Sequence, residues 1–318
     1  MKNLTSTQKG AYLACLTALI SGFSVFLSKF ATKAIPDSSV FTTAKNIGVA
    51  LVLCLIVLLP SIFPKLKHLT KKDWLNLILI GIIGGSIPFL LFFKGLSIST
   101  APATAFIHKT LFIWVAILAV PLLKEKISKM QLGALGLLLA GNFLLGSFSD
   151  WRFDRAGWLV LAATLFWAVE YVLAKKMLAR IDAKIVAWAR MFFGSIALIG
   201  FVLAIGKGAL LISLNYHQLC WIGLSSCLLL GYVLTWYRAL KYLPATAVTC
   251  ILVIASPVTT ALNSAFITHK YSPRDLFGAV VVICAAGIIY YAAIKTERSA
   301  CRLASAKRFG GAGPAKSV

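Results

Sequence analysis

The chain has 318 residues, of which 60% are hydrophobic and 13% are charged. In soluble globular domains about a quarter of the residues are charged, so this composition excludes that class and predicts an integral membrane protein. The formal net charge of +23 would suit nucleic-acid binding, but the basic residues are spread over short segments between apolar runs. We therefore expect the lipid bilayer, and no nucleic acid, as the partner of this basic surface.

Ten apolar runs follow one another, each close to the roughly 20 residues with which a helix crosses the hydrocarbon. Continuously apolar runs favour helices over the alternating strands of a membrane barrel. The predicted spans are residues 11–32, 39–60, 74–93, 101–123, 130–147, 157–179, 184–206, 218–237, 245–267 and 275–294. Residues 295–318 are polar and basic, and we expect a disordered tail in contact with anionic lipid.

Most of the 32 Lys and Arg residues fall in loops on the side of the N-terminus. Positive charge is retained on the cytoplasmic side, so we expect a multi-pass protein of the cytoplasmic (inner) membrane with both termini in the cytoplasm. The loops are short, which leaves no room for a soluble catalytic or binding domain between the spans.

The two halves of the chain resemble each other. The sequence Pro-Ala-Thr-Ala occurs at residues 102–105 and again at 244–247, and other similar residues recur at a separation of about 142 to 146 positions. These pairs are Lys29 and Lys175, Lys45 and Arg190, Gly133-Ala134 and Gly278-Ala279, and Ala140-Gly141 and Ala286-Gly287. We predict two five-helix halves, residues 1–147 and 156–294. Because five is odd, the second copy is inverted in the membrane, an arrangement typical of transporters.

Small residues and prolines mark irregular places in the spans. Gly81, Gly84 and Gly85 predict close helix contact in the third span. Pro88 and Pro257 lie well inside spans, where a missing backbone donor leaves a carbonyl free and bends the helix.

Glu170 is the one acidic residue well inside a predicted span. A buried carboxylate costs several kcal/mol unless it is protonated, paired or hydrated, so its presence requires a reason. One reason is proton coupling, in which the carboxyl binds a proton from one side and releases it to the other. The alternative is a structural ion pair with Lys45 or Arg190.

Three basic residues also lie within spans. Lys45 and Arg190 occupy matching positions in the two halves, and Lys109 follows His108 near the middle of the fourth span. Lys45 and Arg190 could instead extend to the membrane interface. Three bases and one acid favour a solute that carries a carboxylate or phosphate over a cation.

Further candidates could complete a binding cavity. Trp167 and Tyr171 lie beside Glu170 in sequence and could form its wall, and Asn46 adds an amide for hydrogen bonding. Trp236 and Tyr237 lie near a predicted helix end, so we expect them at the membrane interface.

No pattern indicates a cofactor, a metal site or an enzyme. Six of the seven cysteines lie within apolar spans, and their spacing matches neither a disulfide framework nor a zinc site. Nucleotide-binding and catalytic-triad motifs are also absent from the sequence, so nothing favours ATP-driven pumping.

The ten-span layout and several short motifs resemble the EamA-type family of the drug/metabolite transporter superfamily. The first half carries Lys94-Gly-Leu, Pro102-Ala-Thr-Ala, residues 122–128 and Leu132-Gly-Ala-Leu; the second carries Arg238-Ala-Leu, Pro244-Ala-Thr-Ala, Ser256-Pro-Val and Phe277-Gly-Ala. The pattern's first-half proline is replaced near Ile113, and its second-half acid is replaced by His269. Because the second half has no acidic residue at this position, we expect Glu125, the acidic residue of the first half, to cap a loop.

The resemblance implies secondary transport of small metabolites, often export of amino acids or related compounds. Together with the basic cavity, it predicts a secondary-active carrier of a small carboxylate-bearing solute that works by alternating access. We expect export rather than import, with protons as a candidate coupling ion. A multidrug exporter of lipophilic compounds and a non-transport membrane protein remain the alternatives, and the sequence leaves the oligomeric state open.

Overall fold

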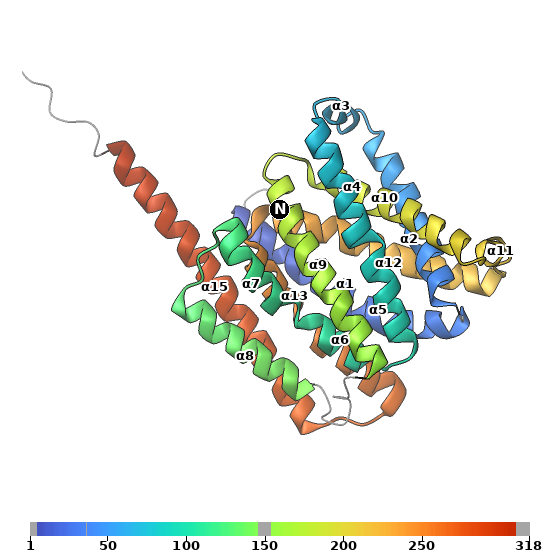
Figure 1. Cartoon of the computed structure of the whole chain (residues 1–318). Coiled ribbons are helices and arrows are strands. Elements are labelled where there is room, and N and C mark those ends of the chain that lie inside the picture. Colours follow the sequence, from blue (N-terminus) through green and yellow to red (C-terminus); the bar gives the residue numbers. More distant parts are fainter. Residues whose placement is uncertain (1–4, 36, 146–153, 310–318) are drawn as a thin grey trace, which may run out of the picture.

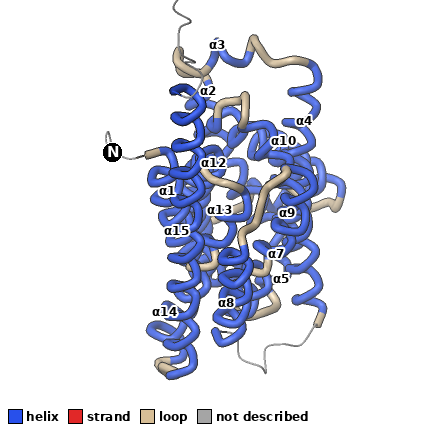
Figure 2. Tube along the Cα trace, turned by 90° about the vertical axis from the view of Figure 1, so that its left-hand side faces the viewer, coloured by secondary structure: helices blue, strands red, loops and turns tan. Residues whose placement is uncertain are grey.

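The computed structural model describes residues 5–35, 37–145 and 154–309, with side chains to residue 295. Within these ranges the secondary structure is entirely helical, and the helices pack side by side in one bundle (Figures 1 and 2). The predicted all-α class is therefore confirmed.

The long helices follow the predicted spans closely. In chain order they are α1 (Ser6–Ala34), α2 (Ser38–Val57), α4 (Lys71–Gly85) with α5 (Ile87–Ser97), α6 (Ala101–Lys109) with α7 (Leu111–Leu123), α8 (Lys129–Leu145), α9 (Arg155–Leu178), α10 (Ala183–Ala204), α12 (Tyr216–Tyr242), α13 (Ala245–Leu252) with α14 (Ala255–Asn263) and the π-helical η2 (Ser264–Thr268), and α15 (Pro273–Phe309). Two short helices, α3 (Phe63–Leu66) and α11 (Gly208–Ile212), lie between spans.

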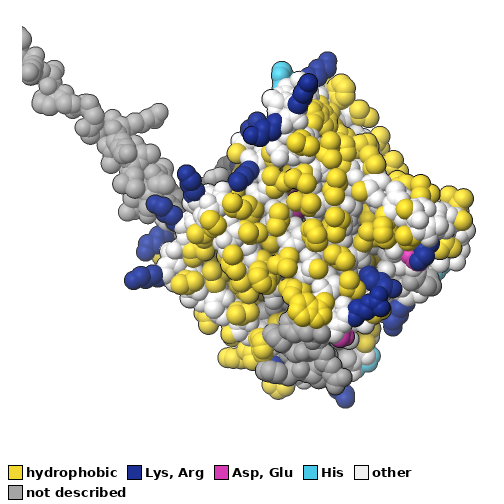
Figure 3. Space-filling view, viewed as in Figure 1, with side chains coloured by type: hydrophobic (Ala, Val, Ile, Leu, Met, Phe, Trp, Pro, Cys, Tyr) yellow, Lys and Arg dark blue, Asp and Glu magenta, His cyan; other side chains and the backbone are white. Residues whose placement is uncertain are grey.

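Nine segments of the described ranges are long and apolar enough to cross a membrane, and α8 is a shorter apolar helix of 17 residues. Exposed apolar side chains cover the middle of the surface seen in Figure 3, and Lys and Arg side chains gather toward its rim. This distribution is the one that a bilayer requires, since apolar atoms face the hydrocarbon and charges face water.

The last helix continues beyond its predicted end at residue 294. It runs to Phe309, which differs from the disorder that we expected from residue 295 onward, and residues 310–318 of the expected tail lie outside the described ranges. The extra turns are rich in Ala, Lys, Arg and Glu, which have high helix propensity and allow a helix to extend into water.

Helix contacts recur between the halves. Helix α1 packs on α12 and its counterpart α9 packs on α5, whereas α2 packs on α10 and α8 on α15. The contact of α1 with α12 is thus matched by that of α9 with α5. The contacts of α2 with α10 and of α8 with α15 each join two helices at the same position of the repeat. The packing follows the duplication seen in the sequence.

Two lysines at matching positions make the same kind of contact. The Lys29 amine donates to the carbonyls of Leu96 (2.9 Å) and Ser97 (3.2 Å) at the end of α5. The Lys175 amine donates to the carbonyls of Leu240 (2.7 Å) and Leu243 (2.6 Å) at the end of α12. A lysine at a helix C-terminus satisfies carbonyls that lack helical partners.

Glu125 caps a helix of the opposite half, whereas the sequence predicted that it caps a loop. Its carboxylate accepts hydrogen bonds from the backbone N–H groups of Ala245 (2.6 Å) and Thr246 (3.2 Å) and from the Thr246 hydroxyl (2.6 Å). Pro244 stands at the N-cap of α13 and has no side-chain acceptor, so Glu125 supplies it.

Removal of this cap gives the first prediction. We expect Glu125→Ala to lower the free energy of unfolding by about 1–2 kcal/mol, because the first N–H groups of α13 lose their acceptor. Thermal unfolding in detergent measures the change. Lys126→Ala, at an exposed neighbouring position, serves as the control, and equal stability of the two variants would contradict the capping role.

Three spans are interrupted. The third breaks at Ser86, just before Pro88, and the fourth spans of the two halves break at Thr110 and at Val253–Ile254. Pro257 lies one turn after the last break, where Val253 accepts instead from the Ser256 N–H (2.8 Å). The prolines therefore mark real breaks, as predicted.

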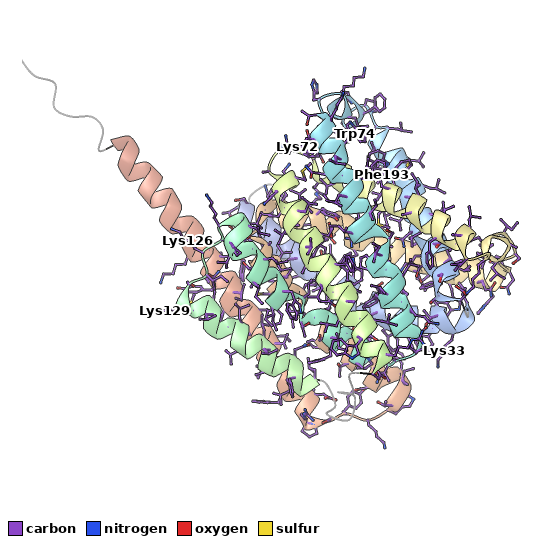
Figure 4. All side chains as sticks on the ribbon, viewed as in Figure 1. Lys33, Lys72, Trp74, Lys126, Lys129 and Phe193 are labelled. Atoms are coloured by element: carbon purple, nitrogen blue, oxygen red, sulfur yellow. The ribbon has the colours of Figure 1, made fainter. Side chains whose placement is uncertain are left out.

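The glycines of α4 allow it to approach α10 closely. A Cβ atom at Gly85 would lie 2.0 Å from the Arg190 carbonyl oxygen, and one at Gly194 would lie 2.7 Å from the Gly85 backbone. Nearby, Trp74 and Phe193 join the same two helices with ring centroids 6.4 Å apart (Figure 4). The predicted close contact of the third span is confirmed.

Candidate functional site

A small buried cavity lies between the two halves. Its volume is about 50 Å³. It is lined by Ser21, Ser24, Val25, Lys45, Phe89, Phe92, Phe93, His108, Trp167, Tyr171, Arg190, Leu229 and Tyr232. Because a water molecule needs about 10–15 Å³ of such space, the cavity accommodates only a few waters in this conformation.

The Gly84 carbonyl is the centre of the hydrogen bonding beside the cavity. It accepts from the Arg190 Nε (3.2 Å) and a terminal guanidinium nitrogen (3.1 Å), and from the Trp167 indole N–H (3.0 Å). In an unbroken helix this carbonyl would accept from residue 88, but Pro88 has no N–H. The helix break thus creates the acceptor that holds Arg190 and Trp167.

Glu170 lies against the same glycine and is fully buried. One carboxylate oxygen accepts from the Tyr237 hydroxyl at 2.6 Å, and the other lies 3.9 Å from an Arg190 guanidinium nitrogen. That oxygen and that nitrogen both lack a hydrogen-bond partner. Gly84 is required here, because a Cβ atom would lie 2.3 Å from the Glu170 Cγ.

Lys45 also lines the cavity, and its ammonium and the Arg190 guanidinium each lie about 5 Å from the centre of the Phe89 ring. The Lys45 side chain is 1% exposed, and its ammonium lies 3.3 Å from the centre of the Phe93 ring and about 5 Å from those of Phe41 and Phe89. Within the described ranges this ammonium has cation–π contacts and no carboxylate partner. Lys45 and Arg190 are both buried, so neither extends to the interface.

His108 and Lys109 approach the cavity from α6. The His108 ring lies beside Trp167, with ring centroids 4.8 Å apart, and lines the cavity. The Lys109 amine turns behind it and donates to the Ser21 hydroxyl (2.9 Å), with the His108 Nδ1 at 3.4 Å. Lys109 is thus one residue removed from the cavity wall.

Tyr171 and Trp167 line the cavity. The Tyr171 hydroxyl lies 3.0 Å from that of Tyr232, and its ring packs on Trp236 with centroids 4.3 Å apart. The expectation that Trp236 and Tyr237 lie at the membrane interface is wrong. Both are 0% exposed, because α12 continues to Tyr242 and places them inside the bundle.

Asn46 does not join this group. Its amide nitrogen donates to the Thr42 carbonyl (2.9 Å) on its own helix, and the residue does not line the cavity. The structure therefore brings together Glu170, Arg190, Lys45, His108, Trp167 and Tyr171, with Lys109 just behind them. Sequence reasoning missed the Gly84 carbonyl and Tyr237, although the pairing of Gly84 with Pro88 four residues later was a readable signal.

The arrangement combines basic groups with a buried carboxyl group. Two buried cations face a cavity with aromatic walls, and one carboxyl group has an oxygen without a donor. Among the described residues, His, Cys, Asp and Glu form no group of three that could hold a metal ion.

Comparison with known proteins identifies the family. The model of the EamA-like transporter family matches residues 8–147 and again residues 155–291. The chain belongs to the EamA-like transporter family. It is therefore a multi-pass membrane transporter built from two EamA repeats, as the sequence motifs indicated.

Further comparisons add only the fold. No curated protein matches the chain. A solved crystal structure, whose title states no activity, is similar with a TM-score of 0.68 and 14% sequence identity, over 89% of this chain and 98% of the other. The helical fold of this chain is thus shared with an experimentally determined structure.

Proposed function

We propose that this EamA transporter is a secondary-active carrier of a small carboxylate-bearing metabolite, such as an amino acid or a related compound, across the cytoplasmic membrane. The observation that carries the proposal is the convergence of Lys45 and Arg190, which occupy matching positions in the two halves, on one buried cavity. A carboxylate would satisfy the Lys45 ammonium, which lacks an acidic partner among the described residues.

The proposed architecture is ten transmembrane helices in two inverted halves, residues 1–147 and 156–294, with a basic segment after them. Contacts at the two ends of α2 and α10 support inversion. Asp37 before α2 pairs with Lys207 after α10, and Asp182 before α10 pairs with Lys65 after α2 (2.6 Å). The two counterpart helices are therefore antiparallel, which is what inversion requires.

The size of the cavity supports alternating access. A volume of about 50 Å³ is small for an amino acid, so we propose that the helices around the site move apart when a solute enters. The interrupted third and fourth spans contribute Phe89 and His108 to the wall next to their breaks. Rocking of one half against the other would then expose the site to each side in turn.

Glu170 is the candidate for proton coupling. Its carboxyl is buried beside Arg190, so protonation would release the guanidinium from its only acidic neighbour in the described structure. A structural ion pair is the competing role. The direction that we favour is export, on the strength of the family resemblance alone. A multidrug exporter of lipophilic cations is disfavoured by the two buried cations that face the cavity.

The orientation in the membrane can be tested by labelling. We propose that the N-terminus, Lys72 and the segment before it are cytoplasmic, whereas Lys33 lies at the opposite end of the molecule (Figure 4). A cysteine at exposed Lys33 should react with an impermeant thiol reagent added outside intact cells, and one at exposed Lys67 should react only after permeabilisation. The reverse pattern would contradict the orientation.

Reconstitution tests the function. The protein is placed in liposomes loaded with amino acids, nucleotides and organic acids, a pH gradient is imposed, and the solutes that move are identified by mass spectrometry. We expect one class of carboxylate to move, and its pH dependence to be lost in Glu170→Gln but kept in Glu125→Gln, which alters an acid of the capping network. Movement unaffected by Glu170→Gln would make Glu170 structural. Movement of cationic drugs, or of no solute, would contradict the proposal.

A further inference from the structure

Among the polar contacts between the two halves, four lie at the ends of the antiparallel pair α2 and α10, two at each end. At the Asp37 end, Asp37 pairs with Lys207 and the Gln218 side chain donates to the Ala34 carbonyl (3.1 Å). At the Asp182 end, Asp182 pairs with Lys65 (2.6 Å) and Asp73 pairs with Arg180. In each contact one partner comes from the first half and the other from the second.

The two ends are related by the internal duplication. Asp37 and Asp182 are the N-caps of α2 and α10. Gln218 stands in the second half where Asp73 stands in the first, each at the N3 position of a capping box. The same positions of the repeat thus bind the opposite half at both ends, although one end has two ion pairs and the other has one ion pair and a neutral hydrogen bond.

The cavity lies between these ends. Lys45 follows Asp37 by eight residues on α2, and Arg190 follows Asp182 by eight residues on α10. Eight helical residues span about 12 Å. The contacts of the Asp37 end thus lie about two turns from Lys45, and those of the Asp182 end lie about two turns from Arg190, on opposite sides of the site.

We propose that the Asp37 end and the Asp182 end are two opposing latches, and that their unequal strength sets the side to which the empty carrier opens. This inference rests on the alternating access of the proposed function. A rocking motion must separate the contacts of one end while it keeps those of the other. The extra ion pair at the Asp182 end favours the conformation in which that end stays closed and the Asp37 end opens.

Both latches are charged at neutral pH. Partial burial acts to raise the pKa of Asp37 and of Asp182, but hydrogen bonds from the partner lysine and from backbone N–H groups outweigh it, and the pKa of each carboxyl lies below its usual value. The basic partners are 42% to 55% exposed, so each ion pair is modest. Loss of one pair should shift the balance between conformations by roughly twofold to fivefold.

Cysteine accessibility measures this balance without a known substrate. Ser24 lines the cavity, and Ser24→Cys in an otherwise cysteine-free full-length chain serves as the reporter in proteoliposomes of known orientation. A membrane-impermeant methanethiosulfonate reagent is added to one side at a time, and the rate of labelling is recorded. In the parent we expect faster labelling from the Asp37 side than from the Asp182 side.

The variants should move the rates in opposite directions. Asp37→Asn should weaken the ion pair with Lys207 and raise the rate of labelling from the Asp37 side by roughly twofold to fivefold. Arg180→Gln should raise the rate of labelling from the Asp182 side and reduce the rate from the Asp37 side. The pair Ala34→Arg with Gln218→Asp, which installs the missing ion pair, should reduce labelling from the Asp37 side. Arg238→Gln removes an exposed charge from the end of α12 and should change neither rate.

Each outcome decides a separate point. Rates that rise together from both sides, or that stay unchanged in all variants, would overturn the latches, since contacts that only stabilise the fold have no sidedness. Restoration of the parental rates by the exchanged pair Asp37→Lys with Lys207→Asp would support them. A reporter that is reached from one side only in every variant would refute alternating access itself, and with it the proposed function.

Discussion

Gly194→Ala is expected to destabilise the protein strongly and to abolish transport. The added methyl group would lie 2.7 Å from the backbone of Gly85, which cannot move without separating α4 from α10. Overpacking of this kind costs about 1–3 kcal/mol, and more where backbone meets backbone. The same shift would displace the Gly84 carbonyl from Arg190, one turn away on α10, so the site and the fold depend on one contact.

The matched control lies on the same helix. A methyl group added at Gly200 would have no neighbouring atom within 4 Å, so Gly200→Ala should be neutral or stabilise the helix by up to about 1 kcal/mol. Thermal unfolding of both variants in detergent, followed by the transport assay, gives the comparison. A Gly194→Ala variant as stable and active as Gly200→Ala would show that the two helices are free to move apart.

Arg190→Met is expected to have the second large effect. The substitution keeps an apolar stem of similar length, but it removes two of the three hydrogen bonds to the Gly84 carbonyl and the only basic neighbour of Glu170 in the described structure. Removing one partner of a buried ion pair typically costs about 3–5 kcal/mol, because the remaining charge has no compensation. We therefore expect lower stability and no measurable transport of a carboxylate.

The double variant separates stability from transport. Glu170→Gln with Arg190→Met leaves no uncompensated charge, so it should recover much of the lost thermal stability while it remains inactive. Equal stability of the single and double variants would mean that Glu170 is neutral once Arg190 is removed. Recovery of transport in the double variant would remove Arg190 from the substrate site.

The fold could be predicted because a membrane limits the choices. Continuous apolar runs permit only helices, and the repeated Pro-Ala-Thr-Ala motif indicated the duplication. The ends of the helices were harder to predict, because a charged residue near the end of an apolar run does not stop a helix. Helix α12 continues past Lys241 to Tyr242. The error at α12 placed Tyr237 at an interface and hid its hydrogen bond to Glu170.

The site could be predicted in part for a similar reason. A charge in an apolar span is conspicuous, so Glu170, Arg190 and Lys45 were found from residue type alone. The face of the helix on which a residue lies could not be predicted in the same way. Apolar residues lie on all sides of α2, so its periodicity does not separate Lys45 from Asn46. A sequence identifies side chains but not the orientation of backbone groups such as the Gly84 carbonyl, which only the structure shows.

The missing hydrogen at Pro88 has a consequence for how this chain can change over generations. An arginine in the membrane interior is tolerated because a proline four residues past Gly84 leaves a carbonyl unclaimed. A chain that loses Pro88 regains a helical hydrogen bond at Gly84 and weakens the contact that holds Arg190. A chain that loses Arg190 leaves the Gly84 carbonyl with the Trp167 indole as its one side-chain donor in the described structure. The two residues, more than 100 positions apart, therefore form one inherited unit in which neither is neutral without the other.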